Sequence, residues 1–335
     1  MKAAILHGPR DLRVDRTPAP TPGPGEAVIR VGMAGLCGTD YSIFAGARPV
    51  HYPKVLGHEF VGMVEAVGAG ASRVRPGERV VVEPNYSCGA CPLCREGNRN
   101  LCLGRVAVGI DVDGCFAEAA RVPERCCWPA PGGGGGGGLV ITEPLAVVVR
   151  AVRRAGVSGG ERAAVVGAGT LGLLALQVLR ARGAHVLVVS RSSRRFPLAH
   201  ELGADATHAL TDGPAEPAAR AFSGREGVDV VVETAGTAEA VSHALALVRP
   251  GGRIVLTGLP HEPTPVAFFS VVRREVTITG SMIYQDEFGE AMRLVASGAV
   301  RTRALVTHRF GLDAIGAAFE AHRAPDAIKV AVLTT

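Results

Sequence analysis

Four cysteines lie within one short stretch of the chain, SCGACPLCREGNRNLC. Cys88, Cys91, Cys94 and Cys102 have the spacing C-x2-C-x2-C-x7-C. Four thiolates this close together can surround a tetrahedral zinc ion, and the glycines between them permit the turns that this requires. Because four sulfur ligands leave no position open for substrate, the pattern predicts a structural zinc. An iron–sulfur cluster is the alternative for the same ligands.

A second set of candidate metal ligands lies nearer the amino terminus. Cys37 stands in Gly35-Leu-Cys-Gly-Thr-Asp40, and His58 and Glu59 stand in Leu56-Gly-His-Glu-Phe-Val-Gly62. A thiolate, an imidazole and a carboxylate are the mixed ligands of a catalytic zinc that keeps one position for water or substrate. Taken singly, each residue has a plainer interpretation, as a buried cysteine or a core histidine.

A glycine-rich segment in the middle of the chain could bind a dinucleotide. Val165-Val-Gly-Ala-Gly-Thr-Leu-Gly172 matches G-x-G-x-x-G between a strand pattern and a helical pattern. The first glycine allows the tight turn, the second lets the backbone approach a pyrophosphate, and the third permits close helix–strand packing. The candidate binding residues are Gly167, Gly169, Thr170, Leu171 and Gly172.

The end of the next apolar run indicates which dinucleotide is preferred. NAD enzymes place an acidic residue here to hold the ribose hydroxyls, whereas this chain has Ser190 followed by Arg191, with Arg195 close behind. A guanidinium can grip a 2′-phosphate through paired hydrogen bonds, and no carboxylate at this position repels it. The sequence favours NADP over NAD. The plainer interpretation of the arginines is a solvated basic helix start.

Two kinds of scaffold must position these residues. Up to about residue 130, short Val-rich runs at 27–31, 61–67 and 79–82 alternate with Pro and Gly, which is typical of a β-rich, partly barrel-like domain. From about residue 145, apolar strands alternate with helical patterns, which predicts a doubly wound α/β fold with a parallel sheet.

The expected strands of the parallel sheet lie near 163–167, 185–190, 205–209, 229–233, 253–258 and 276–280, with helices such as 171–182 and 238–247. The tail from about 283 has a helix, strand, helix, strand pattern, and we expect it to complete the first domain. Between the two parts, Pro131 precedes seven glycines, 132–138. This run is either a hinge or, more simply, a repeat expansion in a tolerant loop.

Taken together, the motifs resemble one family. GHEFVGMVEAVG, followed by PGERV and the cysteine quartet, is similar to the zinc-containing medium-chain dehydrogenase/reductases over essentially the whole chain, and ITEPLA is similar to their sorbitol and threonine dehydrogenase branch. The resemblance implies a GroES-like catalytic domain from 1–144 and 283–335, and a Rossmann domain from 145–282. It also implies two zinc ions per chain. Cys37, His58 and Glu143 would line the catalytic zinc, with Glu59 binding it or exchanging with water.

The proton path is less regular than in the family. Thr39 stands where its hydroxyl would pass the proton of the substrate away from the zinc. Asp40 is expected to orient a zinc ligand. The position where many relatives continue the path with histidine is Ser42, so solvent or a group such as His51 would take over. Serine at this position also resembles some aminocyclitol-pathway dehydrogenases. The expected reaction is hydride transfer between NADP(H) and a small polar alcohol or ketone, such as a polyol, cyclitol, sugar or amino alcohol.

Composition excludes several other classes. A net charge of +5 without clustered Lys or Arg argues against nucleic-acid binding. Early charges break any signal peptide, and the sequence contains no apolar run of about 18 residues, so we expect a cytoplasmic protein that does not enter membranes. The remaining alternatives are a non-catalytic nucleotide-binding relative and a zinc-free NADPH quinone or enoyl reductase. The family forms homodimers and homotetramers, and we expect one of these assemblies.

Overall fold

The computed structural model describes residues 1–131, 136–260 and 263–334. The chain forms two compact units: unit 1 contains Met1–Glu143, Ala291–Ala296 and Thr302–Thr335, and unit 2 contains Pro144–Glu290 and Ser297–Arg301. Residues 132–135 of the glycine run lie outside the described residues, and Gly136 begins a short 3-10 helix. None of the helices among the described residues is long and apolar enough to cross a membrane.

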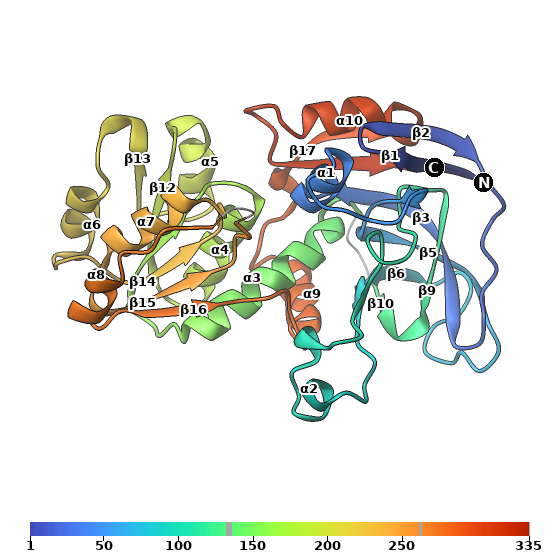
Figure 1. Cartoon of the computed structure of the whole chain (residues 1–335), viewed down its shortest axis with the longest axis horizontal. Helices are drawn as coiled ribbons and strands as arrows, with labels where there is room; N and C mark the ends of the chain where they lie inside the picture. The colour runs from blue at the N-terminus through green and yellow to red at the C-terminus, as the bar shows by residue number, and fades with distance from the viewer. Residues whose placement is uncertain (132–135, 261–262, 335) are drawn as a thin grey trace. The chain divides into compact units, whose positions relative to one another are not determined.

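Unit 1 is built mainly of short strands: β1 (Lys2–Gly8), β2 (Asp11–Arg16), β3 (Glu26–Leu36), β4 (Lys54–Val55), β5 (Glu59–Val67), β6 (Arg79–Val82), β7 (Asn85–Tyr86), β8 (Val106–Ala107), β9 (Ala119–Pro123), β10 (Cys127–Pro129), β17 (Val306–Gly311) and β18 (Lys329–Leu333) (Figure 1). Its helices are α1 (Gly38–Phe44), α2 (Pro92–Arg95) and α10 (Ile315–Ala321), with 3-10 helices η1 (Arg99–Leu101), η2 (Glu124–Cys126), η3 (Gly136–Ile141), η6 (Arg303–Leu305) and η7 (Leu312–Ala314).

The largest sheet of unit 1 runs in the order β10-β6-β5-β3-β18-β17, with β9 also paired to β3. Strand β3 is longer than the predicted 27–31 because two register shifts, at Val28/Ile29 and Val31/Met33, let it continue past Gly32. The tail adds strands to this sheet, since β18 pairs with the end of β3. Buried apolar residues such as Ile29 and Phe60 fill the core beside the sheet.

Unit 2 contains the parallel sheet: β11 (Arg162–Val166), β12 (His185–Ser190), β13 (Ala206–Ala209), β14 (Val228–Glu233), β15 (Val248–Leu256) and β16 (Thr277–Gly280). Its helices are α4 (Thr170–Ala181), α5 (Phe196–Glu201), α6 (Glu216–Ser223), α7 (Ala238–Leu247) and α8 (Phe268–Arg273), with 3-10 helices η4 (Ser193–Arg195) and η5 (Leu210–Asp212). Helices α3 (Thr142–Ala155) and α9 (Phe288–Ala296) have residues in both units.

The order of this sheet is β13-β12-β11-β14-β15-β16, with every pair parallel. The chain adds β12 and β13 on one side of β11 and then β14, β15 and β16 on the other, which is the doubly wound arrangement predicted from the sequence. The predicted strands all form, although β15 begins at Val248, five residues before the predicted start. The carboxyl ends of β11 and β14 meet where the strand order reverses.

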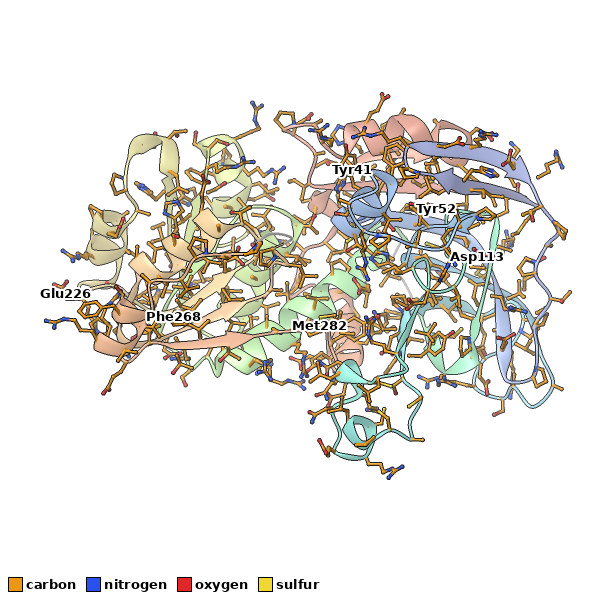
Figure 2. The ribbon with its side chains drawn as sticks, viewed as in Figure 1. Tyr41, Tyr52, Asp113, Glu226, Phe268 and Met282 are labelled. Atoms are coloured by element: carbon orange, nitrogen blue, oxygen red, sulfur yellow. The ribbon has the colours of Figure 1, made fainter. Side chains whose placement is uncertain are left out.

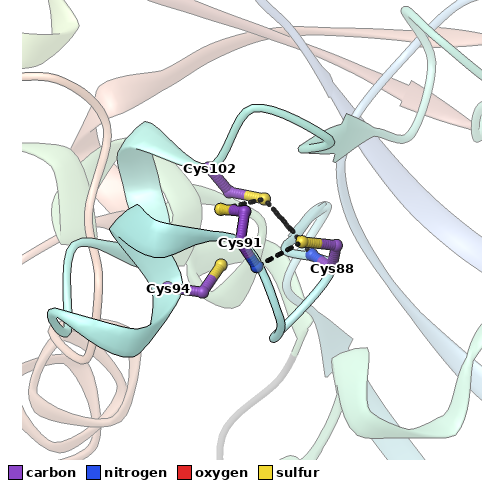
Figure 3. A group of neighbouring side chains, drawn as sticks. All are labelled: Cys88, Cys91, Cys94 and Cys102. Atoms are coloured by element: carbon purple, nitrogen blue, oxygen red, sulfur yellow. Dashed lines mark hydrogen bonds between the residues drawn. The ribbon is translucent and has the colours of Figure 1, made fainter.

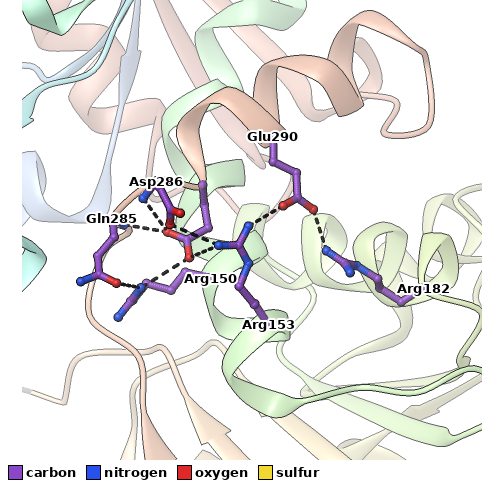
Figure 4. A network of polar contacts seen from close by, with 7 residues as sticks. Arg150, Arg153, Arg182, Gln285, Asp286 and Glu290 are labelled. Atoms are coloured by element: carbon purple, nitrogen blue, oxygen red, sulfur yellow. Dashed lines mark hydrogen bonds and ion pairs between the residues drawn. The ribbon is translucent and has the colours of Figure 1, made fainter. Parts of the chain in front are cut away.

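Contacts place residues 283–290 in unit 2, whereas the sequence assigned them to the first domain. The reason is a network of ion pairs (Figure 4). Glu287 is buried and pairs with Arg150 at 3.4 Å and Arg153 at 3.0 Å, both on α3. Glu290 pairs with Arg153 and with Arg182 after α4, each at 2.6 Å. Apart from this segment and 297–301, the predicted domain limits agree with the contact division to within a residue, and their assignment as domains stays a prediction.

Candidate active site

The four clustered cysteines come from a loop that folds back on itself (Figure 3). Cys91 and Cys94 belong to α2 and its amino-terminal cap, and Cys102 follows η1. Their sulfur atoms all lie within 4.8 Å of one another. The Sγ atoms of Cys102 and Cys88 are 3.4 Å apart, and those of Cys91 and Cys102 are 3.8 Å apart. Tetrahedral Zn–S bonds of about 2.3 Å put sulfurs about 3.8 Å apart, so the cluster fits zinc.

The backbone around this cluster favours thiolates. The N–H groups of Leu103 and Cys94 lower the pKa of Cys91 to about 6, and backbone N–H groups also lower the pKa of Cys88. The N–H of Cys88 acts on Cys102 in the same direction, but burial and the neighbouring thiols outweigh it and raise the pKa of Cys102 to about 11. Four thiolates this close together repel one another, and a bound divalent cation offsets that repulsion.

The second group of candidate metal ligands lies where the end of β3 and the start of β5 are adjacent. Cys37 follows the last residue of β3 and caps α1, and His58 and Glu59 stand at the start of β5. Because Gly35 of β3 pairs with Glu59 of β5, the two ends are adjacent. The ligand atoms of Cys37, His58 and Glu59 lie within 4.8 Å of one another. One sulfur, one nitrogen and one carboxylate oxygen make a donor set that fits zinc.

Asp40 holds this cluster together. It is fully buried, and its two carboxylate oxygens accept hydrogen bonds from the N–H of Cys37 at 2.9 Å and the N–H of Gly57 at 3.2 Å. Its Oδ1 also lies 3.3 Å from Nδ1 of His58. Burial alone would lower the pKa of His58, but Asp40 and Cys37 raise it well above the usual value. Asp40 therefore ties the two ligand-bearing segments through their backbone N–H groups and lies against the imidazole, whose Nδ1 has no hydrogen-bond partner among the described residues.

The sequence did not reveal the partner of Glu59. Lys329, the first residue of β18, places its Nζ 2.7 Å from both carboxylate oxygens of Glu59 and 3.2 Å from the carbonyl oxygen of Leu36. Both charged side chains are buried. Burial would lower the pKa of Lys329, yet Glu59 and Cys37 raise it, so the lysine stays charged. The available signal was a single lysine inside the apolar run AIKVAVL.

Glu143, the other candidate carboxylate, lies in the first turn of α3 and is also buried. It is not a member of the group formed by Cys37, His58 and Glu59. Burial is the largest of the effects that raise its pKa to about 7, with Glu59 adding to the increase and His58 opposing it. Lys329 contacts Glu59 directly and also lowers the pKa of Glu143, but burial outweighs this effect.

The predicted proton path begins in helix α1. Thr39 lies in its first turn and Ser42 one turn later, both half-buried, so their side chains share a face of the helix. His51 is exposed and forms no hydrogen bond or ion pair with another described residue that would tie it to this face. The roles of these three residues stay predictions.

Two positions in the glycine-rich turn of unit 2 tolerate only glycine. Gly167 has φ +106°, and a Cβ there would lie 2.8 Å from Oγ1 of Thr234. A Cβ on Gly172 would overlap the carbonyl oxygen of Gly167. Gly169 differs, because it caps α4 with ordinary extended angles and a Cβ would meet nothing closer than 3.9 Å. Thr170 and Leu171 begin α4, whose amino end can receive a phosphate.

The arginines after β12 occupy different environments. Ser190 ends the strand and is half-buried, and Arg191 is exposed and has no ion pair among the described residues. Arg195 instead folds over the glycine turn, where its Nη1 donates to the carbonyl oxygen of Ala168 at 3.0 Å. Arg191 is therefore free to meet a ligand at the strand end, and Arg195 lies beside the turn itself.

Comparison with known proteins agrees with this geometry. Residues 23–132 match the alcohol dehydrogenase GroES-like domain, and residues 170–297 match the zinc-binding dehydrogenase domain. Human sorbitol dehydrogenase is 33% identical over 335 residues, covering 97% of this chain and 94% of the relative.

Two solved structures show the same fold. A zinc-binding dehydrogenase from Sinorhizobium meliloti 1021, bound to NADP, is 34% identical with a TM-score of 0.94 and covers 99% of each chain. An alcohol dehydrogenase from Escherichia coli CFT073, complexed with NADH, is 30% identical with a TM-score of 0.93, covering 100% of this chain and 99% of that one. The chain therefore belongs to the zinc-containing medium-chain alcohol dehydrogenases, in the branch similar to the sorbitol dehydrogenases.

Proposed function

We propose that this enzyme transfers a hydride reversibly between NADP(H) and a secondary alcohol or ketone of a polyol, cyclitol, sugar or amino alcohol. The observation that carries the proposal is the group of Cys37, His58 and Glu59, whose mixed ligand atoms lie within 4.8 Å of one another. Such a donor set suits a zinc that acts on substrate, in contrast to the all-sulfur cluster. A non-catalytic nucleotide-binding module or a zinc-free reductase has no use for these ligands.

Zinc, when bound, polarises the oxygen of the alcohol or ketone and so favours hydride transfer in both directions. The protein's own groups do the rest. Cys37, His58 and either Glu59 or Glu143 would hold the metal, and Asp40 ties together the segments that carry Cys37 and His58. Thr39 accepts the proton of the substrate hydroxyl and passes it toward solvent along the α1 face that carries Ser42.

Support for NADP comes from the residues after β12. A serine rather than an acidic residue ends the strand, and exposed Arg191 can pair with a 2′-phosphate. Relatives of this fold have been solved with either cofactor, NADP in one case and NADH in another. The arginine is thus the feature of this chain that favours NADP.

Support for a polar substrate comes from the sorbitol dehydrogenase relative and from the low aromatic content of 4%, which leaves few residues to line an apolar pocket.

We further propose a homodimer or homotetramer. Helix α8 exposes Phe268, Phe269 and Val272 at 68%, 78% and 76% (Figure 2 labels Phe268), and an apolar face of this kind suits a subunit contact.

The test is a screen of purified enzyme for NADP reduction against polyols, cyclitols, sugars, amino alcohols and simple long-chain primary alcohols, repeated with Thr39→Val. We expect a polyhydroxylated or amino-hydroxylated substrate to be preferred. Thr39→Val should keep zinc and cofactor affinity while slowing turnover about 100-fold or more, because it removes the hydroxyl and little volume. Wild-type turnover in this variant would refute the proton path, and a clear preference for long-chain alcohols would refute the substrate class.

A further inference from the structure

One of the candidate zinc ligands, Glu59, is bound by an ammonium group of the protein itself. Nζ of Lys329 lies 2.7 Å from both carboxylate oxygens of Glu59, and it also donates to the carbonyl oxygen of Leu36 at 3.2 Å. The side chains of Lys329 and Glu59 are only 5% and 1% exposed, so water screens their attraction little. A cation of the protein thus contacts both oxygens that Glu59 can offer to zinc.

The register of three strands lets this carboxylate reach the lysine. Glu59 of β5 pairs with Gly35 of β3. On its other side, Gly35 pairs with Ala331 of β18, the strand that begins with Lys329. A Cβ on Gly35 would overlap Oε2 of Glu59, so the glycine leaves the space through which the carboxylate crosses β3 toward β18. The ion pair is therefore fixed by the sheet and not by one side-chain rotamer alone.

The same carboxylate also lies within reach of a zinc ion. The ligand atoms of Cys37, His58 and Glu59 lie within 4.8 Å of one another, which fits one ion bound by all three. Zinc in this place would share the carboxylate of Glu59 with Nζ of Lys329. Two cations on one buried carboxylate repel each other, and an oxygen that turns toward zinc loses hydrogen-bond strength to the ammonium. Zinc and Lys329 therefore compete for Glu59.

The charge of Lys329 is opposite to that of a group that supports a metal ligand. A group behind a ligand commonly increases its affinity for the metal, and losing that group weakens metal binding about 10- to 100-fold. Asp40 has such a supporting charge beside His58, since its Oδ1 lies 3.3 Å from Nδ1 of the imidazole. Lys329 instead brings a positive charge against Glu59, which reduces the negative potential that attracts zinc.

We propose that Lys329 is a positioning residue that competes with zinc for the carboxylate of Glu59 and so weakens the hold of this ligand on the metal. Cys37 and His58 then bind the ion more firmly than Glu59 does, and Glu59 is the ligand that the metal loses first. The lysine acts only through this carboxylate. The inference rests on the proposed catalytic zinc, although not on the preference for NADP or on the class of substrate.

The experiment measures zinc binding to the full chain by competition with a chelator of known affinity, without substrate or cofactor. Because two ions per chain are expected, the catalytic site is defined as the one that Cys37→Ser lacks. Lys329→Met removes the cation and keeps an apolar stem. It should bind this zinc about 10- to 100-fold more tightly, the range that corresponds to one charged hydrogen bond. Lys329→Arg keeps the charge and should stay within about 3-fold of the wild type.

Lys54→Met is the matched control. Lys54 is also buried, at 9% exposed, but its Nζ donates to the carbonyl oxygen of Asp111 at 3.2 Å. This variant should bind zinc within about 2-fold of the wild type. Transfer of zinc from the loaded protein to the chelator is timed as well, because this rate does not depend on the stability of the empty protein. Release should be slower from Lys329→Met, and the gain in affinity should shrink to within about 3-fold when Glu59→Gln removes the shared carboxylate.

The outcomes separate this inference from the proposed function. Weaker or unchanged zinc binding by Lys329→Met, or release no slower than from the wild type, would overturn the inference, because the lysine would then only support the fold of the site. An equal gain in Lys329→Arg, or in Lys329→Met combined with Glu59→Gln, would also overturn it, since the effect would not need the charge or the shared carboxylate. A wild type with the same zinc content as Cys37→Ser would instead refute the proposed catalytic zinc, and this inference with it.

Discussion

The buried pair of Lys329 and Glu59 supports a prediction with a definite magnitude. Lys329→Met keeps the length and apolar stem of the side chain but leaves the Glu59 carboxylate buried without its cation. Removing one partner of a buried ion pair costs about 3–5 kcal/mol. For a unit of this size, 1 kcal/mol lowers the midpoint of thermal unfolding by about 2–4 °C. We therefore expect Lys329→Met to lower the midpoint by about 6 °C or more.

Lys2→Met is the matched control. Lys2 pairs with Asp313 at 2.7 Å, the same N···O distance as in the buried pair, but its side chain is 38% exposed and that of Asp313 is 70% exposed. Exposed pairs contribute about 0–1 kcal/mol, so this variant should lose at most about 4 °C. Distance is thus held constant while burial changes.

The midpoint of thermal unfolding of both variants is measured by circular dichroism, with and without added zinc. Both conditions are needed because zinc bound by Glu59 would itself compensate the negative charge of the carboxylate. The double variant Lys329→Met with Glu59→Gln should recover much of the loss, since no buried charge remains without its partner. If Lys329→Met unfolded within about 1 °C of Lys2→Met under both conditions, burial would not be what gives the pair its importance.

Three further predictions concern the metal sites, the cofactor and one buried carboxyl group. Metal analysis should find two zinc ions per chain, with Cys37→Ser folded but holding only one and Cys88→Ser failing in folding first; one zinc in metal-replete wild type would contradict this. Arg191→Ala should weaken NADP(H) about 10- to 100-fold in binding titrations and leave NAD(H) unchanged. Burial raises the pKa of Glu83 from 4.5 to about 7, so the native state keeps a proton that the unfolded chain has lost, and stability should fall as pH rises from about 4.5 to 7. Glu83→Gln should abolish that fall in urea titrations across this range.

Local patterns were enough to predict the scaffold of unit 2. Each strand is a short apolar run between turn residues. Helix α7 forms at the predicted 238–247 because its apolar spacing lies within that segment and its cap, Thr237, immediately precedes it. The cluster of four cysteines could also be predicted from the sequence, because all its members lie within one loop. Short-range information is sufficient wherever the contacts that decide a structure are close in sequence.

The rest of the site depends on contacts between distant segments. Lys329 and Glu59 meet only because β18 and β5 flank the same strand, β3, and no local pattern encodes that adjacency. Contacts group segment 283–290 with unit 2 for the same reason, since its partners Arg150 and Arg153 lie on α3. The buried hydroxyls of Thr257 and Ser281, which lack a hydrogen-bond partner among the described residues, also become visible only once burial is known.

Two glycines of the glycine-rich turn, Gly169 and Gly172, have different reasons to lack a side chain. The sequence assigns Gly169 to the approach of the pyrophosphate and Gly172 to close helix–strand packing. The structure gives the two glycines surroundings that match these roles: a Cβ on Gly172 would overlap the backbone of Gly167, whereas Gly169 has φ −80° and open space to 3.9 Å. Gly172→Ala should therefore lower the midpoint of thermal unfolding. Gly169→Ala should unfold like the wild type yet bind both cofactors at least about 10-fold more weakly, because its methyl group occupies the approach of the pyrophosphate. Wild-type cofactor affinity in Gly169→Ala would show that the phosphates do not pass over this turn, and an undisturbed midpoint in Gly172→Ala would show that the helix can shift to admit a side chain.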